Sequence, residues 1–197
     1  MNKAVLATIY DDPAYWNGDI GYRSPGYRDF DINVIKEAVI LLMKPESVLD
    51  IGCAYGYSVG RFNDLGIKAR GIDISQYALS QAPDYCKPYL VHAPAWDIPF
   101  KDKEFDVIFS SGILEHVPED KMEHTVAEIV RVSSRGVIGV SCLDDPSTHK
   151  EDDTSHCVML KCADWQALFP ADYVVVSDSS TSWKVLLLTN LWRALCQ

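Results

Sequence analysis

Apolar, strand-like runs alternate with helical patterns along most of this chain, and this order restricts the fold more than any other feature. Strands are expected at residues 47–51, 68–74, 88–92, 105–111 and 135–142. Helices are expected at residues 57–65, at 75–82 with Ser75 as N-cap, from residue 119, and at 163–169. Because strands joined by helices pair in parallel and are covered on both faces, we expect a doubly wound, Rossmann-like α/β fold.

The last two strand-like runs follow a different pattern. Residues 172–177 and 183–189 are separated only by the polar stretch "DSSTS", with no helical pattern between them. Short polar connections of this kind join antiparallel neighbours. We therefore expect a seven-stranded, mostly parallel sheet that ends in an antiparallel C-terminal hairpin.

The chain length predicts a single domain. With 197 residues the protein can bury one sizeable core, but it is too short for two ordinary domains. We divide residues 1–197 into an N-terminal part at 1–46, with an aromatic arm and a helix at about 31–43, and a core at 47–197.

The composition excludes several classes of protein. Hydrophobic residues make up 48% of the chain, which excludes a disordered protein, and the formal net charge of -10 disfavours nucleic acid and anionic membranes as partners. The apolar run at residues 4–9 is short for a secretory signal, and no run approaches the roughly 20 apolar residues of a membrane-spanning helix. We expect a cytoplasmic protein whose six cysteines are reduced thiols.

The stretch "VLDIGCAYG" at residues 48–56 places a carboxylate at a strand end and small residues after it. A dinucleotide pattern would read Gly52, Ala54 and Tyr57, and Tyr57 is too large for its third position. Asp50 would also repel a pyrophosphate, whereas it suits an ammonium group. Asp73 ends the next strand, where an acidic side chain can accept hydrogen bonds from ribose hydroxyls. An ammonium, a ribose and no pyrophosphate together indicate S-adenosylmethionine.

Four stretches in order resemble the motifs of class I S-adenosylmethionine-dependent methyltransferases. They are "VLDIGCAYG" (48–56), "GIDIS" (71–75), "APAWDIPF" (93–100) and "FDVIFSSGILEHVPED" (105–120). The resemblance extends over nearly the whole chain, from about residue 48 to 189. It implies S-adenosylmethionine as cofactor and S-adenosylhomocysteine as product.

The resemblance implies a cofactor-binding role for a set of residues along these stretches. They are Asp50 and Gly52 at the methionine portion, Cys53, Ala54 and Gly56 in the turn, Asp73 at the ribose, Ile74, Ala95 and Trp96 at the adenine, and Ser111 and Gly112 near the methionine. Two positions depart from the family pattern. Pro94 stands where an Asp often contacts the adenine amino group, and Ala54 stands where Gly is common.

Three further side chains are candidates for the acceptor side. His116 could act as a general base, while Glu115 and His116 could instead only position the loop, or lie near a divalent metal as in some family members. His156 ends the polar loop at 144–156, which should overhang the site. The spacing of His156, Cys157 and Cys162 matches no usual zinc pattern, so we expect no bound metal.

The N-terminal segment is rich in aromatic residues, namely Tyr10, Tyr15, Trp16, Tyr22 and Tyr27. It is either a docked arm or a lid that closes over cofactor and substrate and excludes water. As a lid, it would bring Tyr22 to the substrate, and Arg23 or Arg28 to the cofactor carboxylate. The segment loosely resembles the arms of some bacterial sugar or glycan methyltransferases.

The expected function is methyl transfer from S-adenosylmethionine to an oxygen or nitrogen of a small molecule, for which a sugar or glycan precursor is one option. The alternative is a catalytically inactive subunit with the same fold that binds the cofactor or a partner. The tail "LWRALCQ" could serve as its partner surface, and a homodimer is left open. A nicotinamide-dependent oxidoreductase is disfavoured by Tyr57 and Asp50.

Overall fold

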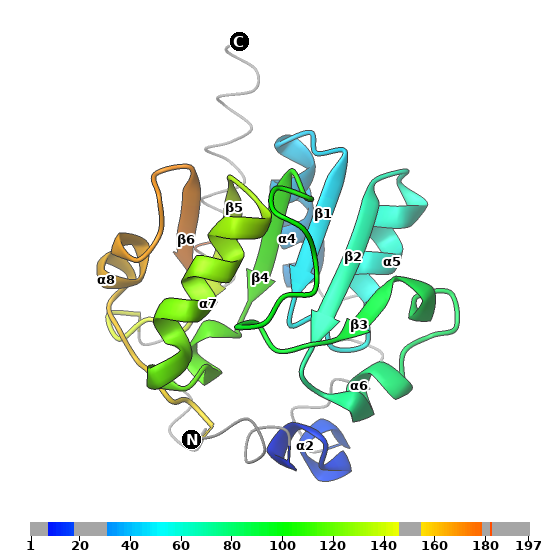
Figure 1. Ribbon diagram of the computed structural model, residues 1–197, viewed down its shortest axis with the longest axis horizontal. Coiled ribbons are helices and arrows are strands. Elements are labelled where there is room, and N and C mark those ends of the chain that lie inside the picture. The colour runs from blue at the N-terminus through cyan, green and yellow to red at the C-terminus, as the bar shows by residue number, and fades with distance from the viewer. Residues whose placement is uncertain (1–7, 18–30, 146–154, 179–181, 183–197) are drawn as a thin grey trace.

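The computed structural model describes residues 8–17, 31–145, 155–178 and 182. Their six strands form one parallel sheet in the order β3-β2-β1-β4-β5-β6 (Figure 1). The strands are β1 Ser47–Ile51, β2 Lys68–Asp73, β3 Leu90–His92, β4 Val107–Ser111, β5 Gly136–Val140 and β6 Tyr173–Ser177. The order reverses between β1 and β4, and open parallel sheets bind ligands beyond the carboxyl ends of strands at such a point.

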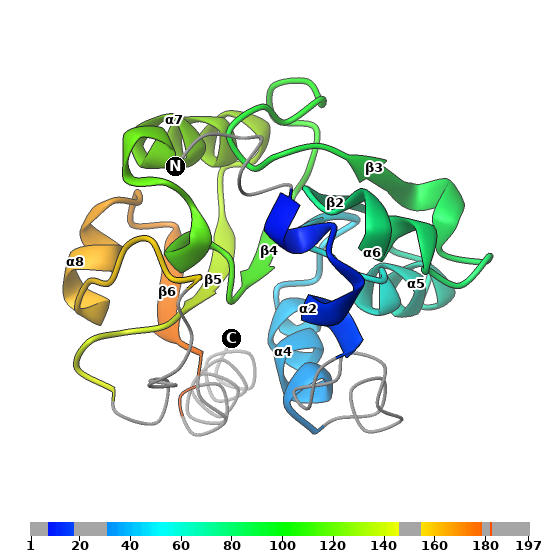
Figure 2. The same cartoon turned by 90° about the horizontal axis from the view of Figure 1, so that it is seen from below.

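Helices cover both faces of the sheet, as the alternating sequence pattern predicts (Figure 2). On one face α4 (Asp31–Leu42) and α5 (Tyr57–Asp64) pack against Val48, Val107 and their neighbours. On the other, α7 (Glu119–Val132) and α8 (Cys162–Ala167) pack against Leu49, Ile108 and Ile138. Adjacent strand residues point to opposite faces, so a run such as β5 is apolar throughout because both of its faces are buried.

Local signals explain where several helices begin. Ser75 caps α6 (Gln76–Ser80), since its hydroxyl accepts a hydrogen bond from the Ala78 N–H, which confirms the expected N-cap. Helix α7 begins directly after Pro118, and two acidic residues in its first turn complement the positive end of the helix dipole. The short helix α2 (Pro13–Asn17) lies at the carboxyl edge of the sheet, below β1 and β2 in Figure 1.

The described residues form a sheet that differs from the expected one, because its strands are all parallel and include no antiparallel hairpin. β6 pairs with β5 in parallel, with Val137 opposite Val174 and Ile138 opposite Val175. This pairing is parallel because the crossover through α8 returns the chain to the same end of the sheet before β6 begins. The described sheet therefore has six parallel strands, and the run at 183–189 lies outside the described residues.

The expectation of reduced cysteines is also wrong for one pair. Cys142 and Cys162 form a disulfide, with their Cα atoms 5.2 Å apart. Cys142 pairs with Leu160 in an isolated parallel bridge, which brings the start of α8 back beside the end of β5. The disulfide closes the connection that contains the polar loop at 144–156.

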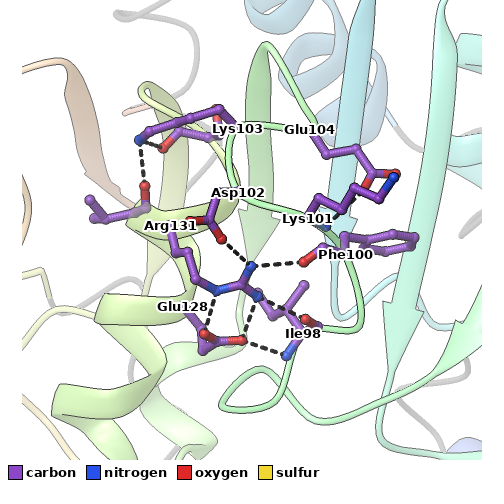
Figure 3. Close-up of polar contacts among 10 residues, drawn as sticks. Ile98, Phe100, Lys101, Asp102, Lys103, Glu104, Glu128 and Arg131 are labelled. Atoms are coloured by element: carbon purple, nitrogen blue, oxygen red, sulfur yellow. Dashed lines mark hydrogen bonds and ion pairs between the residues drawn. The ribbon is translucent and has the colours of Figure 1, made fainter.

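An ionic network fastens the loop between β3 and β4 to α7 (Figure 3). The Arg131 guanidinium pairs with Glu128 and Asp102 and donates hydrogen bonds to the carbonyls of Ile98 and Phe100 at 2.9 and 2.8 Å. Glu128 in turn accepts a hydrogen bond from the Ile98 N–H at 2.9 Å. Because the fork-shaped guanidinium binds several acceptors at once, it fixes the loop geometry.

No helix in the described parts of the chain is long and apolar enough to cross a membrane.

Candidate functional site

A pocket opens at the carboxyl ends of β1, β2 and β4, at the point where the strand order reverses. It encloses about 780 Å³, part of it open to solvent. The pocket is lined by Tyr10, Tyr15, Trp16, Ile51, Gly52, Ala54, Ile72, Asp73, Ile74, Ala93, Ala95, Trp96, Ser111, Gly112, Ile113 and His116. These residues come from all four motif stretches and from the N-terminal segment.

The turn after β1 forms the floor of the pocket. Gly52, Ala54 and Gly56 have positive φ angles of 78°, 49° and 73°, a backbone conformation that favours glycine. A Cβ added to Gly52 would lie 2.1 Å from the Ile113 side chain, so the turn and the loop after β4 meet without space for a side chain. Gly56 ends the turn and precedes α5, and it does not line the pocket.

Asp73, the last residue of β2, connects the turn after β1 with the start of α6. One carboxylate oxygen accepts a hydrogen bond from the Ala54 N–H at 2.8 Å, and the other accepts one from the Ser75 N–H at 2.8 Å. Burial raises the pKa of Asp73 to about 6, against the opposing effect of these two hydrogen bonds. Each oxygen keeps a second lone pair, so the carboxylate retains capacity to bind hydroxyl groups in the pocket.

Asp50 lies beside the pocket and not in its lining. Its side chain is buried among Asp73, Glu37, Lys36 and Arg61. Burial, with the carboxylates of Asp73 and Glu37, raises the pKa of Asp50 to about 8. The nearby charges of Lys36 and Arg61 lower the pKa of Asp50 and favour its ionised form, as a cationic ligand beside the carboxylate would.

Residues after β2 and β3 form an apolar part of the pocket lining. They are Ile74, Ala93, Ala95 and Trp96. The loop is held to the β2 end because the Ala93 N–H donates to the Asp73 carbonyl at 3.0 Å. This side therefore provides flat apolar surfaces that suit a planar ring.

Ser111 connects the pocket to a partly buried ion pair that the sequence did not predict. Its hydroxyl donates to Asp178 at 2.8 Å and accepts a hydrogen bond from the Lys36 ammonium at 2.5 Å. Lys36 and Asp178 are themselves 2.8 Å apart. Asp178 follows β6 directly, so the strand-end rule could have found it, whereas Lys36 sits in an apolar helical pattern that predicted only packing.

The N-terminal segment covers part of the pocket. The Tyr10 carbonyl accepts hydrogen bonds from the Trp16 indole N–H and from the Ser75 hydroxyl, at 2.6 and 2.5 Å. Tyr10 and Trp16 are buried, and the Tyr10 ring lies edge-on to the His116 ring with the ring centres 5.9 Å apart. Tyr22, Arg23 and Arg28, for which contacts with the substrate or the cofactor were predicted, lie outside the described residues.

The acceptor-side candidates meet at one end of the pocket. His116 lines it, and the ring centre of His156 is 4.8 Å from that of His116. Glu115 is buried behind them, and one of its carboxylate oxygens accepts a hydrogen bond from the Ser141 N–H at 3.0 Å.

Cys53 lies under the turn and does not line the pocket. Its thiol packs against Gly71 of β2. Burial, with the nearby carboxylates of Asp73 and Asp50, holds the pKa of the Cys53 thiol well above its usual range. This environment agrees with a packing residue and not with a nucleophile.

A methyltransferase domain family model matches residues 49–140, the part of the chain that carries most of the pocket. A tocopherol O-methyltransferase of Arabidopsis thaliana is 26% identical over 82% of this chain and 60% of its own length. A norajmaline N-methyltransferase of Rauvolfia serpentina is 32% identical over 47% of this chain and 34% of its own. The chain thus spans between one third and two thirds of the length of these relatives.

Solved structures share the fold at lower identity. An S-adenosylmethionine-dependent methyltransferase from Archaeoglobus fulgidus superposes with a TM-score of 0.55 at 17% identity, over 73% of this chain and 69% of its own. The YcgJ protein of Bacillus subtilis gives 0.53 at 20% identity, over 67% and 65%. The match to a methyltransferase domain over residues 49–140, the methyltransferase relatives and the shared fold together support a class I S-adenosylmethionine-dependent methyltransferase.

Proposed function

We propose that the chain transfers a methyl group from S-adenosylmethionine to an oxygen or nitrogen of a small-molecule acceptor, with a sugar or glycan precursor as the favoured class. The observation that carries the proposal is the pair of carboxylates at the adjacent ends of β1 and β2. Asp73 lines the pocket and each of its oxygens keeps a second lone pair, and Asp50 is buried beside the pocket.

The residues present fit the cofactor. The buried Asp50 carboxylate suits the ammonium of the methionine portion, and Asp73 suits the two ribose hydroxyls. Ile74, Ala95 and Trp96 provide the apolar surfaces for the adenine ring. The small residues of the turn after β1 allow a ligand to approach the backbone closely. Pro94 supplies no carboxylate for the adenine amino group, so contact there depends on the backbone and on Trp96.

When bound, S-adenosylmethionine supplies a methyl group already activated by a positively charged sulfur. The protein's task is then chiefly to hold the two reactants in line, and positioning of this kind can supply roughly 7–11 kcal/mol of barrier lowering. The turn after β1 and the loop after β4 fix one reactant, and His116 and His156 contact the acceptor on the other side. His116 is the proposed catalytic residue, which holds the acceptor and receives its proton.

The aromatic N-terminal segment is proposed to exclude water from the pocket. Tyr10, Tyr15 and Trp16 line the described pocket, and the hydrogen bonds to the Tyr10 carbonyl attach them to the start of α6. Aromatic faces also suit the C–H groups of a sugar ring, which supports the favoured acceptor class.

Turnover tests the proposal against the alternative of an inactive subunit. The protein is incubated with S-adenosylmethionine and a panel of sugars, sugar nucleotides and phenols, and the release of S-adenosylhomocysteine is followed by mass spectrometry. The proposal expects release that depends on an acceptor and that falls strongly in the Asp73→Asn variant. Tight cofactor binding without release for any acceptor class would instead support the inactive subunit.

A further inference from the structure

The disulfide between Cys142 and Cys162 lies at the edge of the sheet where the pocket opens. Cys142 follows the carboxyl end of β5, and Cys162 is the first residue of α8. Neither is among the described residues that line the pocket. Any effect of the disulfide on the reaction therefore has to pass through the chain between the two.

The chain segment 155–161 connects the disulfide with the pocket. At the disulfide end, Leu160 forms a parallel bridge with Cys142, and the Leu143 N–H donates to the Leu160 carbonyl at 2.9 Å. Residues 155–160 are all half-buried, and except for the bridge residue they lie in no helix or strand of the described chain. Segments of this kind open more readily than buried strands, so a covalent cross-link at one end restricts them strongly.

The other end of this segment lies at the acceptor end of the pocket. The Glu115 carbonyl accepts hydrogen bonds from the Cys157 N–H at 2.6 Å and from the Val158 N–H at 3.1 Å. The ring centre of His156 lies 4.8 Å from that of His116, which lines the pocket. The disulfide therefore helps to fix residues that the proposed function assigns to the acceptor.

The two sulfur atoms of the disulfide differ in accessibility. Cys142 is 0% exposed, whereas Cys162 is half-buried and lies between the exposed residues Lys161 and Ala163. A thiolate opens a disulfide by attacking one of its sulfur atoms, so access decides which atom reacts. A reductant therefore reaches this disulfide through Cys162, and Cys142 is the sulfur that is released first.

We propose that the Cys142–Cys162 disulfide is a redox-active site, which a dithiol reductant opens through Cys162, and that its opening loosens the acceptor end of the pocket. One thiolate of the reductant bonds to the Cys162 sulfur, and the Cys142 sulfur leaves with the electron pair and takes up a proton. The second thiol of the reductant then displaces Cys162, which is protonated in turn. The protein gains two electrons and two protons, and the dithiol becomes a disulfide.

The cofactor side of the pocket belongs to another part of the sheet. Asp73 ends β2, and Ile74 and Ala95 follow β2 and β3, whereas β1 and β4 stand between these strands and β5. Opening the disulfide should therefore change acceptor turnover and leave the binding of S-adenosylmethionine unchanged. This consequence rests on the proposed function, whereas the redox reaction does not.

The redox reaction is tested on the folded protein without denaturant. The protein is equilibrated in mixtures of reduced and oxidised dithiothreitol, quenched with acid, alkylated and mapped by mass spectrometry. We expect Cys142 and Cys162 to become alkylated together as the mixture becomes more reducing, while the far-UV circular dichroism stays the same. Cys157→Ser, which removes a half-buried thiol outside the disulfide, is the control and should react in the same way. A bond that resists reduction until the protein unfolds, or that is absent in the most oxidising mixture, would overturn the inference.

Amide hydrogen exchange measures the structural effect. In the reduced protein, residues 155–161 should exchange at least about tenfold faster than in the oxidised protein, and β1 and β2 should not change. The Cys162→Ser variant cannot form the bond and should match the reduced protein. Equal exchange of residues 155–161 in both states would overturn the inference. Faster exchange throughout the chain would also overturn it, because the disulfide would then stabilise the whole fold.

Cofactor binding and turnover separate this inference from the proposed function. S-Adenosylmethionine is titrated into both redox states by calorimetry, and acceptor turnover is measured in both. We expect cofactor affinities equal within about twofold, and a kcat/KM for the acceptor that is at least about tenfold lower in the reduced state. Equal acceptor turnover in both states overturns the inference and leaves the proposed function intact. Redox-dependent exchange without turnover of any acceptor in either state supports the redox site and contradicts the proposed function.

Discussion

Asp73 accepts a hydrogen bond from the Ala54 N–H at 2.8 Å, and this contact ties the end of β2 to the turn after β1. The same carboxylate accepts a hydrogen bond from the Ser75 N–H, so it also orders the start of α6. One side chain thus shapes the pocket and remains available to a ligand within it. This double role makes Asp73 the most informative residue to change.

The substitution Asp73→Asn should weaken S-adenosylmethionine binding by about 10- to 100-fold. Hydrogen bonds to a charged group contribute about 1.5–3 kcal/mol, and each 1.4 kcal/mol is a factor of ten in affinity. Calorimetry measures the effect, with Asp97→Asn on the exposed surface of the neighbouring loop as the control. Equal affinity in Asp73→Asn and the parent protein would show that Asp73 does not bind the ribose.

Binding of S-adenosylmethionine should tighten as pH rises from 6 to 8. The pKa of Asp50 is raised to about 8, so much of the free protein carries a neutral Asp50 in this range, whereas an ammonium partner requires the carboxylate. The expected slope is at most about tenfold per pH unit. 5′-Methylthioadenosine lacks the amino-acid portion and should show a smaller slope. An affinity for S-adenosylmethionine that does not change with pH would show that Asp50 does not bind the ammonium group.

The same pKa predicts the stability of the ligand-free protein. Because burial raises the pKa of Asp50 above its unfolded value of 3.8, the folded state binds more protons between pH 4 and 8. The free energy of unfolding contributed by this group therefore falls as pH rises through that window. Urea unfolding at several pH values checks this, and Asp50→Asn should remove most of the dependence. If the free energy of unfolding of Asp50→Asn keeps its full dependence on pH, then other titrating groups cause that dependence.

The turn after β1 offers a matched pair of substitutions. Ala54→Gly should stabilise the protein by about 1 kcal/mol, because Ala54 has a φ of 49°, which is unfavourable for any side chain. Gly52→Ala should destabilise it by about 2 kcal/mol or more, since the new Cβ would lie 2.1 Å from Ile113 at a φ of 78°. Both are measured by urea unfolding. Shifts of the same sign in the two variants would contradict the described turn.

Lys36→Met should destabilise the protein by about 1–3 kcal/mol. The ammonium is buried and pairs with Asp178, and Asp50 and Glu37 are also nearby, so its removal leaves several carboxylates without compensation. Lys44→Met, at an exposed position just after the same helix, is the control and should change little. If Lys36→Met changes the free energy of unfolding as little as the control does, then solvent already screens the ion pair between Lys36 and Asp178.

Much of the fold could be predicted from sequence because it depends on local patterns. The expected strands at 47–51 and 68–74 and the Ser75 cap agree closely with β1, β2 and α6. The antiparallel hairpin was predicted from the short polar stretch between residues 172–177 and 183–189, and the second of these runs lies outside the described residues. The parallel pairing of β6 with β5 depends on the crossover through α8, which is a tertiary property.

The residues of the candidate site also fall into two groups, those that local sequence patterns predict and those that only the tertiary fold brings into place. Asp73, Gly52 and Ser111 lie at strand ends, where the rule for parallel sheets locates ligand-binding residues, and all three line the pocket. The partners of Ser111 could not be found from spacing, because Lys36 precedes the sheet in sequence and Asp178 follows it. The disulfide likewise depends on a bridge that only the folded chain forms.

The central claim is that the pocket holds S-adenosylmethionine through Asp50 and Asp73. Its most direct test is calorimetric titration of S-adenosylmethionine, S-adenosylhomocysteine and NAD into the purified protein. The account predicts one-to-one binding of both sulfur compounds and no heat from NAD. Binding of NAD, or no binding of either sulfur compound, would contradict it.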